Sequence, residues 1–66
     1  MTIDDVKKRL QDIRDNSNND EGSHIREDRL RDDLLRAIAD GKCNDPEACA
    51  KEALKSNRID FSRWYA

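Results

Sequence analysis

Aromatic side chains, glycine and proline are all scarce in this sequence of 66 residues. Phe, Trp, Tyr and Pro occur once each and Gly occurs twice, so no glycine-rich loop can cradle a phosphate group. No apolar run approaches the roughly 20 residues that a transmembrane helix needs. The motifs of nucleophile-elbow hydrolases, P-loop enzymes and helical zinc proteases are missing as well. We therefore expect a chain that is not an enzyme, uses no cofactor and makes no membrane contact.

A concentration of charge of one sign is also lacking. The 13 basic and 15 acidic residues give a net charge of -2, and the balances of residues 1–22, 23–41 and 42–66 are -2, -1 and +1. Neither a basic surface for nucleic-acid phosphates nor an acidic mimic of DNA is indicated, so nucleic acid is not an expected partner. With 42% charged and 35% hydrophobic residues, residues 1–66 are expected to form one small helical domain.

Cysteine and histidine are too few for a structural metal site. A zinc site needs four ligands, and His24 with two cysteines supplies too few, so no metal is expected. The first residues, MTIDDVKKRL, lack the apolar core of a signal peptide, which predicts a cytoplasmic location. Cys43 and Cys49 are therefore expected to be free thiols. A disulfide between them stays possible, because it would tie a loop to the first turn of the next helix.

The apolar spacing predicts an all-α fold, namely a compact three-helix unit with an aromatic C-terminal tail packed on it. The expected helices span about residues 3–14, 24–40 and 46–56, and the tail spans residues 58–66. Residues 15–22, DNSNNDEG, are all polar or glycine. Such residues disfavour helix interiors, so this segment is predicted to be a long, mobile loop.

Capping residues define the expected helix ends. The side chains expected to cap helix starts are Thr2, Ser23 and Asp45. Pro46 then occupies the first helical position, where its missing N–H costs nothing. Gly41 and Asn57 are expected to end the second and third helices in the left-handed conformation.

Polar residues lie on the core-facing stripe of the second expected helix. The apolar members of this stripe are Leu30, Leu34 and Ile38. Glu27 and Arg31 fall on the same stripe, and His24 lies at its edge, within reach of Glu27. The three residues are interpreted either as a half-buried ion pair with a structural role or as a polar notch that grips a ligand or a partner's side chain. A metal site of His24, Glu27 and Asp28 is a third interpretation.

All three aromatic residues fall within the last six positions. Ile59, Phe61 and Trp64 are expected to close the core, because aromatic side chains bury large apolar areas. The alternative is a tail that docks as a peptide on a partner, with Tyr65 the most exposed of its aromatic residues. The candidate interaction surface comprises His24, Glu27, Arg31, Trp64 and Tyr65.

Several short motifs of this sequence follow one another in a characteristic order along the chain. His24 is followed by Glu27-Asp28, by the run DLLRAIA over residues 33–39, and by IDF-x-RW over residues 59–64. This order resembles a group of small proteins encoded by actinobacterial phages and their hosts. The resemblance implies a compact helical unit and names no activity. The asparagine-rich segment and the two cysteines depart from the pattern of that group.

The leading hypothesis is a small, non-enzymatic accessory protein of the phage type that acts by binding a partner protein or a copy of itself. One alternative is a regulator associated with nucleic acid, in which the second and third helices form a unit like a helix-turn-helix. The other alternative is a small-molecule or metal binder at the His24/Glu27/Arg31 notch.

Overall fold

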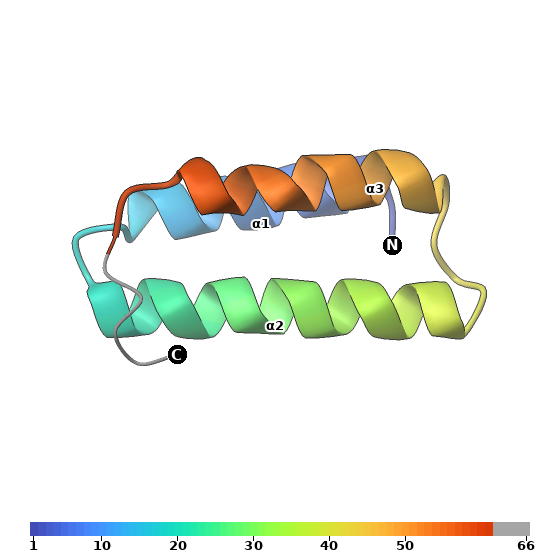
Figure 1. Ribbon diagram of the computed structural model, residues 1–66, viewed down its shortest axis with the longest axis horizontal. Coiled ribbons are helices and arrows are strands. Elements are labelled where there is room, and N and C mark those ends of the chain that lie inside the picture. The colour runs from blue at the N-terminus through green and yellow to red at the C-terminus, as the bar shows by residue number, and fades with distance from the viewer. Residues whose placement is uncertain (62–66) are drawn as a thin grey trace.

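Three helices pack side by side in the computed structural model, which describes residues 1–61 (Figure 1). Helix α1 spans Ile3–Asp15, α2 spans Asp20–Ala39 and α3 spans Pro46–Ala53. A short 3-10 helix, η1, continues α3 over Leu54–Arg58. No strand occurs within the described part of the chain, so the predicted all-α, three-helix class is confirmed.

Helix α1 begins as the sequence predicts. The Oγ1 of Thr2 accepts a hydrogen bond from the Asp5 N–H at 3.2 Å, and the Asp5 carboxylate accepts one from the Thr2 N–H at 2.9 Å. This reciprocal capping box satisfies two backbone donors at the helix start. The hydrogen bonds from Thr2 also hold the pKa of Asp5 below its ordinary value. On the inner face of the helix, Val6, Leu10 and Ile13 are fully buried.

Helix α2 begins earlier than predicted, at Asp20. Its N-cap is Asn19, whose side-chain oxygen accepts a hydrogen bond from the Gly22 N–H at 3.1 Å. The predictions of a loop over residues 15–22 and of an N-cap at Ser23 are therefore wrong. Two acidic residues fill the first turn of α2, where the helix macrodipole favours negative charge, and this offsets the low helix propensity of the segment.

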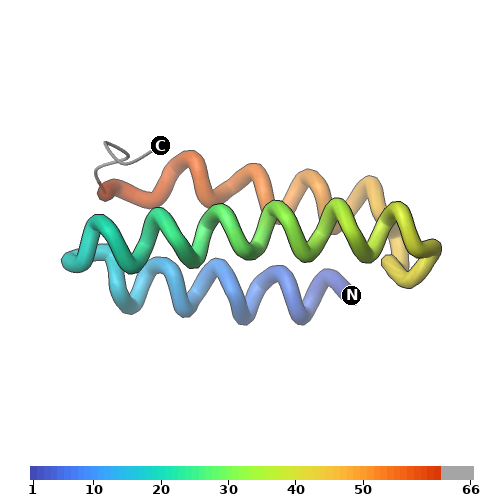
Figure 2. Tube along the Cα trace, turned by 90° about the horizontal axis from the view of Figure 1, so that it is seen from below, coloured from blue at the N-terminus to red at the C-terminus, as the bar shows by residue number. Residues whose placement is uncertain are grey.

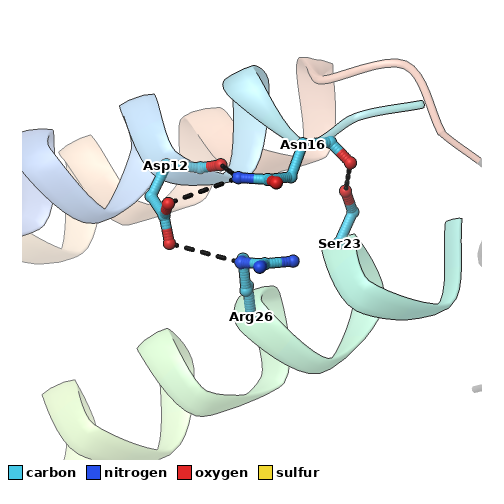
Figure 3. A network of polar contacts seen from close by, with 4 residues as sticks. All are labelled: Asp12, Asn16, Ser23 and Arg26. Atoms are coloured by element: carbon cyan, nitrogen blue, oxygen red, sulfur yellow. Dashed lines mark hydrogen bonds and ion pairs between the residues drawn. The ribbon is translucent and has the colours of Figure 1, made fainter. Parts of the chain in front are cut away.

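A polar network joins the end of α1 to the start of α2 (Figure 3). The buried Ser23 donates a hydrogen bond from Oγ to the carbonyl oxygen of Asn16 at 2.7 Å, and the Asn16 amide donates to the carbonyl oxygen of Asp12 at 2.8 Å. On the Asp12 side chain, Oδ2 lies 3.3 Å from Nε of Arg26. The connection between the helices is thus a short turn over residues 16–19, tied to both of them.

The connection from α2 to α3 follows the sequence prediction at both ends. Gly41 has φ 69, the left-handed conformation expected after the helix. The side chain of Asp45 accepts a hydrogen bond from the Ala48 N–H at 3.2 Å, and Pro46 is the first residue of α3. Asp45 itself has φ 50, a backbone conformation that aspartate tolerates better than most residues.

The C-terminal end of α3 differs from the prediction of a helix over residues 46–56. The α-helix ends at Ala53, and the chain tightens into η1, which includes Asn57 and Arg58. Tightening into 3-10 geometry is a common way for a helix to end. Asn57 does not have a positive φ, so the prediction that it forms a left-handed cap is wrong, and the predicted tail starts one residue later than position 58.

One continuous core fills the space between the helices. Its members are Val6, Leu10, Ile13, Leu30, Leu34, Cys49, Ala53, Ile59 and Phe61. Ile59 and Phe61 are 7% and 8% exposed, so the first part of the predicted tail does pack on the bundle. Trp64, which was expected to join them, and Tyr65 lie outside the described residues.

The helices alternate in direction, so that α2 runs antiparallel to both α1 and α3 (Figures 1 and 2). An ion pair crosses from α1 to α2 at Arg9–Asp33, with Nη1 and Oδ2 2.7 Å apart. Together with the Asp12–Arg26 pair near the turn, it links the outer faces of the two helices.

Candidate functional site

Glu27 and Arg31 meet at the boundary between α2 and η1. Oε2 of Glu27 lies 3.7 Å from Nη2 of Arg31, and the two side chains are 2% and 43% exposed. The same nitrogen donates hydrogen bonds to Oγ of Ser56 at 3.3 Å and to Oδ1 of Asn57 at 2.5 Å. Arg31 thus places a cation beside a buried carboxylate and ties α2 to η1.

This geometry favours a structural role for the Glu27–Arg31 pair. A carboxylate with so little exposed surface is not presented to a ligand arriving from solvent, whereas a buried charge needs a partner close by. Sequence reasoning missed Ser56 and Asn57 as partners of Arg31. The spacing that reveals contacts within one helix carries no information about contacts between helices that are far apart in the sequence.

His24 belongs to a separate arrangement on the same helix. It is 8% exposed, and its Nε2 lies 3.3 Å from Oδ2 of Asp28. Its Nδ1 is buried and has no hydrogen-bond partner within residues 1–61. The ion pair of His24 is thus with Asp28. Over the same residues, no group of three or more His, Cys, Asp or Glu side chains is placed to hold a metal ion.

An apolar groove lies between α2 and α3, and we call it the α2–α3 groove. The residues that line it are Arg31, Leu34, Leu35, Ala50, Ala53 and Leu54. Its volume is about 240 Å³. The two large side chains at its sides, Leu35 and Leu54, are 66% and 61% exposed. Apart from the Arg31 guanidinium, the described side chains that line the groove are all aliphatic.

Charged residues that neighbour the groove-lining residues along α2 and α3 form ion pairs with one another. On α2, Arg36 Nη2 lies 3.0 Å from Asp32 Oδ2, and on α3, Lys51 Nζ lies 3.5 Å from Glu47 Oε1. Each pair joins residues four apart on one helix, which keeps both charges in solvent. The surroundings of the groove therefore carry no excess of either sign, which suits an apolar contact with a polar rim.

The expected core-facing stripe of α2 contains Leu30, Leu34 and Ile38 but not Leu35, whereas the sequence alone did not place Leu54 on either face of its helix. Leu35 follows Leu34 directly, so it points about 100° away from the buried stripe. Leu54 lies where α3 tightens into η1. The exposure of Leu35 could be predicted from the sequence, whereas the exposure of Leu54 depends on where the α-helix ends.

A second hollow lies between the end of α1 and η1. It has a volume of about 460 Å³ and is lined by Arg14, Ser17, Lys55, Arg58, Ile59 and Asp60. Nζ of Lys55 lies 2.9 Å from Oε1 of Glu52, and this hydrogen bond lowers the pKa of Glu52. Within residues 1–61, the carboxylates of Glu52 and Asp60 offset two of the three cations of the hollow. This mixture of charges among the described residues does not favour binding of a nucleic-acid backbone.

Within the described residues, no helix combines the length and the apolar character that crossing a membrane requires. Comparison of the chain with protein-family models, with curated protein sequences and with solved structures gives no match. Function is therefore inferred from the site itself. Because Trp64 and Tyr65 lie outside the described residues, the site is built from the α2–α3 groove and Arg31.

Proposed function

We propose that this protein is a small non-enzymatic accessory protein that acts by binding another protein, and that the α2–α3 groove is its contact surface. The observation that carries this proposal is the exposure of Leu35 and Leu54, which are 66% and 61% exposed in a chain with 42% charged residues. Two large aliphatic side chains on either side of an apolar depression are typical of a surface that another molecule covers.

The chemistry of the groove indicates what the partner presents. An aliphatic or aromatic side chain would fill the depression between Leu35 and Leu54. A carboxylate or a carbonyl beside that side chain would face Arg31, whose side chain is 43% exposed. The contacts of Arg31 with Glu27, Ser56 and Asn57 described above use Nη2, and an arginine also carries N–H donors on Nη1 and Nε. An apolar anchor next to an acceptor on one face of a partner helix fits this arrangement.

The arrangement of α2 and α3 does not favour the helix-turn-helix alternative. In a helix-turn-helix the two helices cross at a steep angle, so that the second can enter the major groove. Here α2 and α3 run antiparallel along most of the shorter helix (Figure 1). The small-molecule alternative at the His24/Glu27/Arg31 notch also gains no support, because Glu27 and His24 are 1% and 8% exposed.

Site-specific photo-crosslinking in cells that produce the protein tests this proposal. A photoreactive residue is placed at position 35, at position 54 or at position 25. Ile25 is the matched control because it is an exposed aliphatic residue of α2, 44% exposed, and does not line the groove. We expect positions 35 and 54 to capture the same protein and position 25 to capture none.

A second substitution tests whether capture depends on the α2–α3 groove. Leu54→Ser should abolish capture from position 35, whereas Ile25→Ser should leave it unchanged. If about half of the burial energy of one leucine is lost, affinity falls by about tenfold. Equal capture from positions 25 and 35, or capture from position 35 that Leu54→Ser does not alter, would show that the groove is not the contact surface.

A further inference from the structure

Cys43 and Cys49 lie side by side where the α2–α3 connection meets the first turn of α3. Both thiols donate hydrogen bonds to the carbonyl oxygen of Asn44, from Cys43 Sγ at 3.8 Å and from Cys49 Sγ at 3.3 Å. The Cys43 thiol is also close enough to Cys49 to contribute to the raised pKa of the Cys49 thiol. Cys49 is fully buried in the core, whereas Cys43 is only partly buried and packs against it. Both sulfur atoms thus lie close to the same backbone carbonyl oxygen, that of Asn44.

We propose that Cys43 and Cys49 form a reversible redox site, which closes to an intramolecular disulfide by exchange with a low-molecular-weight disulfide. Both thiols are directed at one carbonyl oxygen, at 3.8 and 3.3 Å, so rotation of the two side chains toward each other can bring their sulfur atoms to bonding distance. Both thiols are free in the structure, which is therefore the reduced form of the site.

The backbone around the two cysteines holds them in place. The Asn44 N–H donates a hydrogen bond to the Met1 carbonyl at 2.9 Å, and the Met1 nitrogen donates to the Lys42 carbonyl at 2.6 Å. On the other side, Asp45 caps α3. The turn between the thiols is thus tied both to the N-terminal segment and to α3, and such restraint raises the effective concentration of one thiol at the other.

The difference in exposure assigns a role to each thiol. Cys43 can be reached from solvent, so its thiolate attacks one sulfur of the small disulfide RSSR, forms a Cys43–S–S–R bond and releases RS⁻. Burial raises the pKa of the Cys49 thiol, and the neighbouring Cys43 thiol adds to this effect. Cys49 therefore remains protonated and unreactive until the mixed disulfide lies against it.

The second step completes the exchange. Cys49 loses its proton and its sulfur attacks the Cys43 sulfur, which forms the Cys43–Cys49 bond and expels the second RS⁻. In sum the two protein thiols lose two electrons and two protons, and RSSR becomes two RSH. The small disulfide is the oxidant, and an excess of the thiol RSH reverses both steps.

Intact-mass analysis of the full chain in glutathione redox buffers tests the proposal. Samples at a series of GSH/GSSG ratios are quenched with an alkylating agent and weighed, both in native buffer and in urea. We expect a monomer that has lost two hydrogen atoms and takes up no alkylating agent. The equilibrium constant for its formation should be at least about tenfold larger in native buffer than in urea, which corresponds to about 30 mV.

Two variants separate the roles of the thiols. Cys49→Ala should accumulate the mixed disulfide with glutathione at Cys43, whereas Cys43→Ala should stay unmodified while folded. Circular dichroism checks that both variants keep their helices. If one of the variants unfolds, the comparison of native buffer with urea on the unaltered chain still tests the proposal. The proposal is overturned by an equilibrium constant no larger in native buffer than in urea, by a stable glutathione adduct on the unaltered chain, or by disulfides formed only between two chains.

Discussion

Replacing Arg31 with methionine removes the cation beside Glu27 and breaks the link from α2 to η1, while keeping an unbranched apolar chain of similar length. At 3.7 Å, two unit charges attract by about 4.5 kcal/mol at an effective dielectric constant of about 20, and by about 1.1 kcal/mol in bulk water. Arg31 is 43% exposed while Glu27 is 2% exposed, so the pair lies between these limits. We expect Arg31→Met to lower the free energy of unfolding by about 2–3 kcal/mol.

Arg36→Met is the matched control for this change. Arg36 also pairs with an acidic residue one helical turn away on α2, but at 3.0 Å and with side chains that are 75% and 58% exposed. Exposed pairs of this kind contribute about 0.3–0.5 kcal/mol. In thermal unfolding, the melting temperature should fall by about 10–20 °C for Arg31→Met and by no more than about 4 °C for Arg36→Met.

A double-mutant cycle identifies the cause of the loss. If Arg31→Met destabilises the protein because it removes the Arg31 cation from beside the buried Glu27 carboxylate, then Glu27→Leu combined with Arg31→Met should be more stable than Arg31→Met alone. Equal losses for Arg31→Met and Arg36→Met would refute the reasoning about burial. An additive double mutant would show instead that the bonds from Arg31 to Ser56 and Asn57 account for the loss.

Three further changes probe the fold. Leu30→Ala should lower the free energy of unfolding, measured in urea, by about 2–5 kcal/mol, because Leu30 is fully buried. Leu35→Ala, at an exposed position, should lower it by less than about 0.5 kcal/mol. Equal losses would mean that the core is assigned to the wrong face of α2. Asn19→Ala removes the N-cap of α2 and should cost about 1 kcal/mol, with faster amide exchange confined to the first turn; unchanged exchange there would place the helix start elsewhere. Cys49 has a raised pKa in the folded chain, so the unfolded chain loses this proton first as pH rises, and stability should begin to fall above about pH 8.5. Cys49→Ala should lack this part of the alkaline loss, and an identical pH profile for both proteins would contradict the assignment.

The ends of the helices show how far local sequence signals reach. Thr2, Gly41 and Asp45 act through their own backbone neighbours, so their roles could be predicted from residue type and position alone. Asn19 is an equally good cap, and the acidic residues after it are a second signal for a helix start. The prediction failed there because a run of polar residues was weighted as a loop. Ser23 was given the capping role, although its hydroxyl bonds to the carbonyl oxygen of Asn16 in the preceding turn.

The candidate site depended on contacts that no local spacing contains. Spacing along α2 correctly brought Glu27 near Arg31, because four residues make about one helical turn. The partners of Arg31 in η1 and the pairing of Leu35 with Leu54 across the groove depend on how α2 and α3 are placed side by side. The approach of Cys43 and Cys49 to the same carbonyl oxygen depends in addition on the left-handed backbone of Asp45, which turns the chain sharply between the two cysteines.

The two ion pairs between α1 and α2 select one register of the helix hairpin over another. If α2 slid by one turn, Leu34 and Ile38 would occupy the places of Leu30 and Leu34, and Arg31 would take the buried place of Glu27. The aliphatic positions of the stripe thus tolerate the slipped hairpin, although it would bury the Arg31 cation. In addition, Ala37 would then lie beside Arg9 and Leu30 beside Asp12, and both ion pairs would be lost. Exposed ion pairs add little to the stability of the native state, and here their contribution is to penalise the competing alignment.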